Sequence, residues 1–215
     1  MMNQEFYNQI SQACCYITVF LNDELISEGT GFAFTQDGQI MTAGHVITGR
    51  MPLKHEDYND SAIKIFAKFP GKSLLECRIL ICGVHILFPA FKNLIQIDQA
   101  IIKPINTLDF DYPILKTIYG EIKLGEEVLC AGYSDELEIP FQIEKNLKPN
   151  IENVDLFYDA MKFGYLSDMT GPIIKRGYIS NIRQIQSSGS ILIDKPQYNI
   201  ELSFNVFMID TSMHS

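Results

Sequence analysis

Two residues, His45 and Asp98, have the types of a general base and of the acid that orients it. His45 follows a strand-like run and two small residues, Ala43 and Gly44, which leave room for another element to approach the imidazole. A general base needs that access, and it needs a partner that holds its ring. Asp98 lies 53 residues downstream, at the head of an apolar run that can partly bury its carboxylate. A carboxylate bonded to Nδ1–H fixes the tautomer and stabilises the imidazolium formed during catalysis.

Both residues also have structural interpretations that the sequence leaves open. A histidine at the end of a strand is often a polar side chain whose ring has found a hydrogen-bond partner. An aspartate at the head of a strand often caps the strand or a turn, as we expect of Asp109 and Asp111. The pair becomes a catalytic candidate only if the fold brings the two side chains together.

The elements that must position these residues are strands. Short alternating or β-branched runs recur between Gly, Pro, Asn and Asp, and Gln36-Asp37-Gly38 predicts a hairpin turn. The runs occupy residues 14–21, 31–34, 39–44, 62–69, 73–88, 99–105, 126–133, 176–185, 190–194 and 199–210. In 62–69 the alternation sets Lys64 and Lys68 on the face opposite the apolar residues. About ten strands with turns between them predict an all-β barrel or sandwich.

One segment has helical spacing. Apolar residues recur every three or four positions over 151–163, with Asn150 as a candidate N-cap and Gly164 as a stop. This predicts one short helix, inside an insertion at about 136–169, whose apolar face packs on a barrel. Pro113 and Gly120 interrupt the strand texture, so we expect two β units, at 1–112 and 113–215.

The composition is that of a folded, acidic chain. Its 215 residues are 47% hydrophobic and 20% charged, enough for one or two domains with a sizeable core. A net charge of −9 argues against a broad nucleic-acid surface, because an acidic chain repels phosphate. No apolar run reaches the ~18 residues of a membrane span, and the N-terminus has no signal-peptide pattern. Five cysteines, an odd number, favour reduced thiols and a cytoplasmic location.

The segment GTGFAFTQDGQIMTAGHVI, residues 29–47, resembles the histidine segment of the trypsin/chymotrypsin-like serine endopeptidases, most closely their bacterial Deg-type branch. In that family a Gly-Ser/Thr-Gly-Phe strand leads through a turn to Thr-Ala-x-His-Val. Asp98 in IDQAIIKP matches the family's aspartate before an aliphatic strand. Further similarities follow in the family's order at LGEEVLCAGY (124–133), TGPIIKRGYISNI (170–182) and FMIDTSMHS (207–215).

The resemblance implies a fold and a chemistry. It implies two antiparallel β-barrels with the active site in the cleft between them, and a polypeptide substrate. His45 and Asp98 are the expected base and orienting acid, and both come from the first barrel. The second barrel supplies the nucleophile and the substrate pocket. This chemistry needs no cofactor. The oligomeric state stays open.

The sequence departs from the family at the nucleophile. The motif Gly-x-Ser-Gly-Gly, which also makes the oxyanion hole, is absent and is expected just beyond Ser215. Ser187, Ser188 and Ser190 lie in an expected turn at the wrong place in the order, and Met169 stands where MTGP would need a serine. We therefore expect an incomplete second barrel and a 215-residue fragment without peptidase activity.

Two alternatives stay open. The chain can be a non-catalytic relative that keeps the barrels as a protein-binding module, although an intact His45/Asp98 pair argues against a pure binding role. The missing nucleophile can also be a cysteine, as in viral double-barrel proteases. The residues that follow Ser215 distinguish serine from cysteine.

Two other signals have structural interpretations. Cys77, Cys82 and His85 have a spacing compatible with zinc, but Cys77 and Cys82 should face opposite sides of a regular strand, so we expect core cysteines instead. Gly29-Thr30-Gly31 lacks the pattern of a phosphate-binding loop. It predicts a turn and a close backbone approach.

Overall fold

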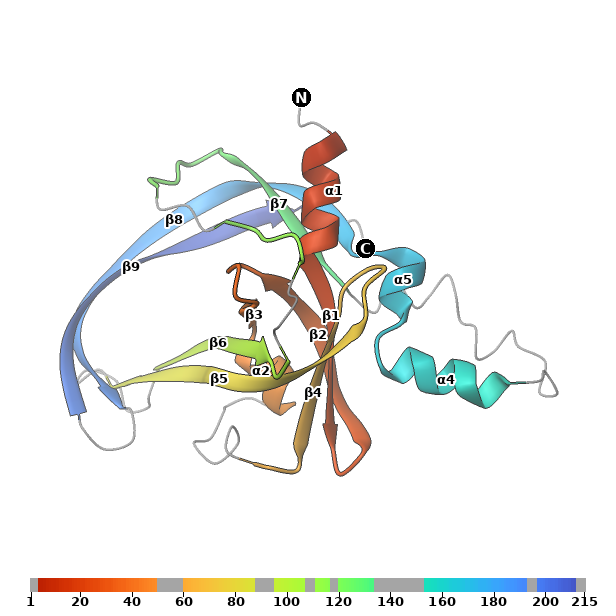
Figure 1. The fold of residues 1–215 in the computed structure, drawn as a ribbon. Coiled ribbons are helices and arrows are strands. Elements are labelled where there is room, and N and C mark those ends of the chain that lie inside the picture. The colour runs from red at the N-terminus through yellow and green to blue at the C-terminus, as the bar shows by residue number, and fades with distance from the viewer. Residues whose placement is uncertain are drawn as a thin grey trace.

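Six antiparallel strands of the first half of the chain close into a barrel (Figure 1). The structure, a computed structural model, describes residues 4–49, 60–87, 95–106, 111–116, 120–133, 153–192 and 197–211. The barrel strands are β1 (Cys14–Leu21), β2 (Glu24–Ala33), β3 (Ile40–Thr42), β4 (Ile63–Lys68), β5 (Leu74–Leu87) and β6 (Ile95–Pro104). Their order is β4-β1-β2-β3-β6-β5, and pairing of β4 with β5 closes the ring. The order β4-β1-β2-β3 is a Greek key, because the fourth strand returns beside the first.

The barrel core follows from the alternation of side chains along each strand. Cys15, Ile17 and Val19 of β1 point inward and are fully buried, and they share one core with residues of every other barrel strand. The predicted hairpin is confirmed, since β2 pairs with β3 across the turn that contains Gly38 at φ +84°. A glycine takes this left-handed conformation without strain.

A β-bulge in β5 overturns the prediction that Cys77 and Cys82 face opposite sides. Opposite β6, the register shifts between Ile79 and Ile81, so Leu80 is an extra residue with no partner. The extra residue reverses the alternation beyond it. Leu80 and Ile81 are both exposed, and Cys77 and Cys82 both enter the same core.

Three further strands form a partial second sheet rather than a second closed barrel. They are β7 (Glu127–Gly132), β8 (Ile173–Leu192) and β9 (Gln197–Thr211), and β8 pairs with both neighbours. The end of β8 also pairs with β5 of the barrel, at Ile86↔Ile191. The barrel prediction is thus confirmed for one closed barrel only.

The predicted turn at 187–190 was wrong. Residues 176–185 and 190–194 were expected to be two strands, but β8 runs through the serine-rich segment without a break. The reason is long-range pairing, because β9 bonds to β8 from Gly177↔Thr211 to Leu192↔Gln197. Pairing with a long neighbouring strand overrides the turn preference of Ser and Gly.

The described residues contain more than the one helix predicted. They form α1 (Gln4–Ala13), α2 (Gly44–Thr48), α4 (Val154–Lys162) and α5 (Leu166–Thr170). The predicted helix corresponds to α4, which begins after Asn153 and ends at Phe163, while Asn150 lies outside the described residues. The missed helix α1 buries Ile10 and Ala13, which lie on one face three residues apart.

The helical segment that contains α4 and α5 packs on the outside of the barrel. The ring of Phe163 stacks on Phe20 at 5.0 Å and meets Phe66 edge-on at 5.3 Å. A Cβ on Gly164 would lie 2.9 Å from the ring of Tyr16, so the chain approaches β1 closely at this point. These contacts help to bury Tyr16 and Phe20 on the outward face of β1, while Cys14 on the same face is buried in a cluster with Ile10 and Tyr133. The contacts are made by Phe163 and Gly164, which directly follow α4, so the expectation that the apolar face of the insertion helix packs on a barrel stays a prediction.

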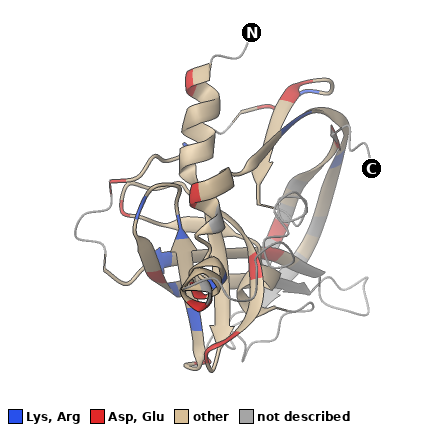
Figure 2. Ribbon diagram, turned by 90° about the vertical axis from the view of Figure 1, so that its right-hand side faces the viewer, with Lys and Arg blue, Asp and Glu red and all other residues tan. Residues whose placement is uncertain are grey.

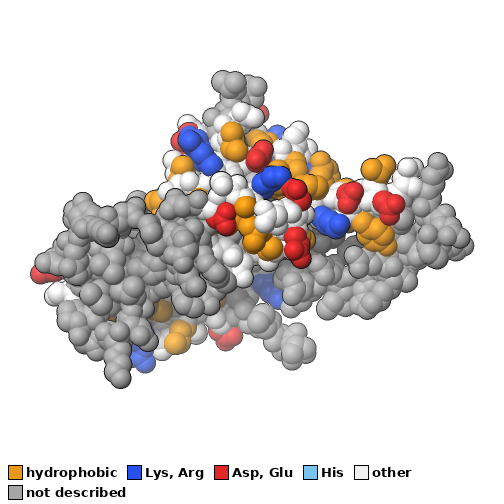
Figure 3. Space-filling view, turned by 90° about the horizontal axis from the view of Figure 1, so that it is seen from below, with side chains coloured by type: hydrophobic (Ala, Val, Ile, Leu, Met, Phe, Trp, Pro, Cys, Tyr) orange, Lys and Arg blue, Asp and Glu red, His pale blue; other side chains and the backbone are white. Residues whose placement is uncertain are grey.

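The surface carries mixed charge. Acidic and basic residues are both scattered over the ribbon (Figure 2). Seen from below, α4 projects from the barrel at the right of the view (Figure 3). Leu156 and Asp159 of this helix are exposed. Among the described residues, no helix has the length and apolar character needed to cross a membrane.

Candidate active site

His45 lies at the start of a short helical turn that follows β3 directly. Ala43 has an extended backbone, α2 begins at Gly44, and Gly49 ends it in the left-handed conformation at φ +67°. The turn thus begins at the small residues Ala43 and Gly44 that the sequence singled out, and it ends at a glycine that was not predicted from the sequence. Val46 and Ile47 of α2 enter the barrel core, which fixes the turn to the barrel.

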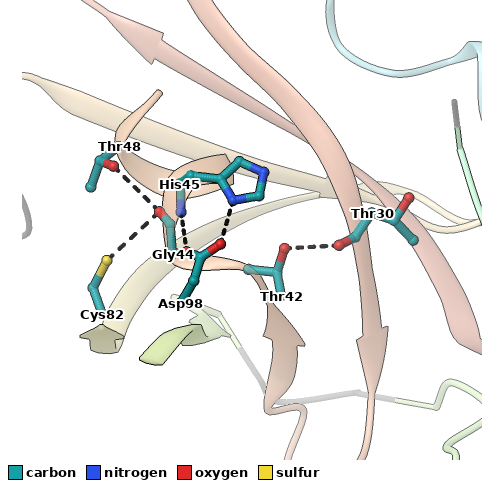
Figure 4. Close-up of polar contacts among 7 residues, drawn as sticks. All are labelled: Thr30, Thr42, Gly44, His45, Thr48, Cys82 and Asp98. Atoms are coloured by element: carbon teal, nitrogen blue, oxygen red, sulfur yellow. Dashed lines mark hydrogen bonds and ion pairs between the residues drawn. The ribbon is translucent and has the colours of Figure 1, made fainter. Parts of the chain in front are cut away.

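Asp98 of β6 binds His45 at two points (Figure 4). One carboxylate oxygen lies 2.5 Å from Nδ1 of the ring, and the other accepts the backbone N–H of His45 at 2.8 Å. The two bonds fix both the position of the residue and the orientation of its ring. The structure therefore brings together the two residues that the sequence singled out, although they are 53 positions apart.

The environment of Asp98 favours its charged form. Partial burial disfavours the carboxylate, but hydrogen bonds from the His45 ring and from the N–H groups of His45 and Gly44, with the histidine's charge, outweigh it and lower the pKa of Asp98. The side chain of Asp98 is 26% exposed. An ionised Asp98 accepts a hydrogen bond from Nδ1–H of His45. Nε2 is then the unprotonated ring nitrogen that can accept a proton.

Nε2 of His45 is accessible. In Figure 4 it points away from Asp98, and the side chain is 51% exposed. Among the described residues, none forms a hydrogen bond to Nε2. A neutral imidazole held by Nδ1 in this way can take a proton at Nε2 from a bound group and return it.

Behind the histidine, two buried side chains hold the carbonyl of Gly44. The hydroxyl of Thr48 donates to it at 3.4 Å, and the thiol of Cys82 lies 3.9 Å away as a weaker donor (Figure 4). Burial, with the nearby charge of Asp98, raises the pKa of Cys82 to about 11. Cys82 is therefore a neutral support of the turn and not a nucleophile.

The close approach predicted at Gly29-Thr30-Gly31 is present, but the turn is not. All three residues lie within β2. A Cβ on Gly29 would lie 2.6 Å from Cγ2 of Val46, and one on Gly31 would lie 2.6 Å from Cδ1 of Ile17. The first glycine lets the histidine turn pack on β2, and the second lets the core close beneath it.

The other sequence candidates lie elsewhere. Ser188 is exposed on β8, and Ser187 and Ser190 also belong to that strand. Met169 is exposed in α5. Ser215, His55 and His214 lie outside the described residues. Within the described part of the chain, no three His, Cys, Asp or Glu side chains gather as a metal site would require.

Lys68 is a buried charged residue, and the sequence did not predict its burial. Alternation set it on the solvent face of β4, but its side chain is 1% exposed. The reason is the α5 segment, which covers that face and supplies Asp168 as a counter-charge at 2.5 Å. The sequence around Lys68 cannot predict this burial, because the covering segment lies 100 residues further along the chain.

Known proteins were compared with this chain. No model of a known protein family matches it, and no curated protein sequence is similar to it.

Proposed function

We propose that this chain belongs to a trypsin-like serine endopeptidase and carries its general base, His45, and its orienting acid, Asp98. The observation that carries the proposal is the two-point bond between Asp98 and His45, with Nε2 left accessible. The ordered similarities of 29–47, 97–104, 170–182 and 207–215 to that family support it, as does the closed barrel that holds both residues.

The proposed reaction assigns His45 two proton transfers. Nε2 takes the proton of a serine hydroxyl while the oxygen attacks a peptide carbonyl, and the carboxylate of Asp98 stabilises the imidazolium. The imidazolium then gives this proton to the leaving amine, which departs and leaves an acyl-enzyme. A water molecule attacks the acyl group in the same manner and restores the serine.

The serine and the oxyanion donors are assigned to residues other than these 215. The motif Gly-x-Ser-Gly-Gly does not occur in the sequence. The described part of the run that resembles the family's approach to the nucleophile, residues 207–211, lies in β9, where Ile209 pairs with Ile179 and Asp210 with Tyr178 of β8. We expect the 215 residues alone not to hydrolyse peptides by this mechanism.

The test has a genetic and an enzymatic part. Reading the coding frame past codon 215 is expected to show Gly-x-Ser-Gly-Gly, and a Cys in place of Ser would change the nucleophile class only. The protein encoded by the whole frame is then assayed with fluorogenic peptides beside its His45→Ala and Asp98→Asn variants. Both substitutions should abolish cleavage, with losses of roughly 10⁴-fold.

The outcomes separate the proposal from its alternative. A stop codon after Ser215, with no cleavage by the chain, overturns the protease proposal and favours a non-catalytic binding module. Cleavage that survives His45→Ala would also overturn it, because the base would then be another residue.

A further inference from the structure

One hydroxyl group joins the barrel to the second sheet. Oγ1 of Thr30, in β2, accepts the backbone N–H of Tyr133 at 2.7 Å and donates to the backbone carbonyl of the same residue at 3.3 Å. Tyr133 directly follows β7. A threonine hydroxyl can donate once and accept twice, so this side chain satisfies both backbone groups of Tyr133.

The two halves are in close contact at this point. A Cβ on Gly132 would lie only 3.1 Å from Oγ1 of Thr30, so β7 approaches β2 closely and a larger residue at this position would have to displace Thr30 slightly. The ring of Tyr133 meets Tyr16 of β1 at 5.1 Å, and the two belong to a second apolar cluster with Ile10 and Cys14. Tyr133 is buried, so water does not readily replace the bonds from Thr30.

The same residue also contacts the segment that leads to His45. The backbone carbonyl of Thr30 accepts the hydroxyl of Thr42 at 2.8 Å (Figure 4). Thr42 is buried, ends β3, and is separated from His45 only by Ala43 and Gly44. Gly29, the residue before Thr30, packs on Val46, the residue after His45. Two adjacent residues of β2, Gly29 and Thr30, thus contact the chain just after and just before His45.

We infer that Thr30 is a positioning residue that fixes the second sheet relative to His45. The inference rests on the proposed function, because that reaction needs a base from the barrel and a nucleophile from the segment that follows β9. Thr30 touches no reacting atom. It acts through Tyr133 on one side and through Thr42 on the other.

The test compares Thr30→Val with Thr30→Ser in the 215-residue chain. Valine has the shape of threonine and suits a strand, but it removes both bonds to Tyr133, whereas serine keeps the hydroxyl. Hydrogen exchange of the Tyr133 amide should accelerate roughly fivefold or more in Thr30→Val. Residual dipolar couplings should show that β7 and β8 have changed their orientation relative to the barrel. In Thr30→Ser, the exchange rate of the Tyr133 amide and the residual dipolar couplings should equal the wild-type values within experimental error.

A matched control is available on the neighbouring strand. Thr18 of β1 is a buried threonine whose hydroxyl has no hydrogen-bond partner among the described residues. Thr18→Val makes the same chemical change without touching Tyr133, so Tyr133 exchange should stay at the wild-type rate. Equal exchange rates and couplings in Thr30→Val and Thr18→Val would overturn the inference.

A second variant tests the link to the histidine. Thr42→Val removes the bond to the Thr30 carbonyl and leaves the bonds to Tyr133 in place. The ¹⁵N shifts of the His45 ring should move, and Tyr133 exchange should not. Unmoved His45 shifts would overturn the positioning role, and this variant decides the matter if Thr30→Val does not fold.

These readouts do not depend on peptide cleavage. The proposed function fails if His45→Ala leaves cleavage intact, whereas the positioning role fails if the exchange rates, couplings and ring shifts do not change. Each idea is therefore overturned by its own measurement.

Discussion

Lys68 of β4 donates a hydrogen bond of 2.5 Å to Asp168 of α5, which lies 100 residues further along the chain. The ammonium also donates to the carbonyl of Phe69 at 3.1 Å and lies 4.9 Å from the centre of the Tyr165 ring. The same oxygen of Asp168 accepts the N–H of Gly71 at 2.7 Å. A charge buried in the barrel wall therefore depends on a carboxylate from the second half of the chain.

Asp168→Asn should destabilise the protein strongly. The substitution leaves the ammonium of Lys68 buried without a counter-charge, which costs about 3–5 kcal/mol for a fully buried pair. Since Asp168 is 34% exposed, we expect a loss of about 2–3 kcal/mol in the free energy of unfolding, measured by urea titration. Adding Lys68→Met should recover part of the loss, because the unpaired charge is then removed.

The matched control for this prediction is a second lysine of β4. Lys64 pairs with Asp23 at 2.6 Å, but the two side chains are 51% and 82% exposed. Asp23→Asn should leave the free energy of unfolding unchanged within error, because exposed ion pairs contribute little. Equal losses in Asp23→Asn and Asp168→Asn would show that the α5 segment does not hold Lys68.

The contribution of Asp98 to stability should depend on pH. Its pKa in the folded state lies below the ordinary value of about 3.9. A lowered pKa stabilises the folded state above the unfolded value, and this contribution is lost as the pH falls through the folded value. The wild-type protein should therefore exceed Asp98→Asn in unfolding free energy by about 1–2 kcal/mol at pH 7, and by less at pH 3.

The control for the pH experiment is Glu201→Gln, which removes one negative charge from an exposed position in β9. The unfolding free energies of all three proteins are compared at pH 7 and pH 3. A difference between wild type and Asp98→Asn that is the same at both pH values would contradict the bond between Asp98 and His45.

Thiol labelling should distinguish one cysteine from the other four. Cys14, Cys15, Cys77 and Cys82 are buried, whereas Cys130 of β7 is partly exposed. Burial raises the pKa of Cys14 to about 11 and, with the charge of Glu76, that of Cys77 to about 12. A thiol reacts as the thiolate, so a disulfide reagent at pH 8 should label one thiol rapidly and four only as the protein unfolds.

Cys130→Ser is the matched variant for labelling. It should remove the rapid phase and leave the unfolding-limited phase unchanged. Rapid labelling of any remaining thiol in this variant would contradict the burial of the other four cysteines.

The sequence predicted most strands of the barrel and the two residues of the candidate site. The apolar run at 14–21 and the alternation over 62–69 give β1 and β4 close to their observed bounds. The turn at Gln36-Asp37-Gly38 gives the β2–β3 hairpin, but the predicted strand at 31–34 covers only the end of β2, which begins at Glu24. The period of two is a local property, because one face of each strand must be apolar to enter a core. His45 and Asp98 were recognisable because the motifs around them lie close to them in sequence.

Tertiary structure alone decided which faces are covered and which residues meet. The bulge at Leu80 directs both Cys77 and Cys82 into the same core. Pairing with β9 makes β8 continuous through its serines. The α5 segment buries Lys68, and β7 reaches Thr30. The alternation of residues along a strand predicts which face is apolar. It does not predict that a segment 100 residues away will cover the polar face. Such contacts are fixed only when the whole chain packs, because their free energy comes from burial and hydrogen bonds between distant segments.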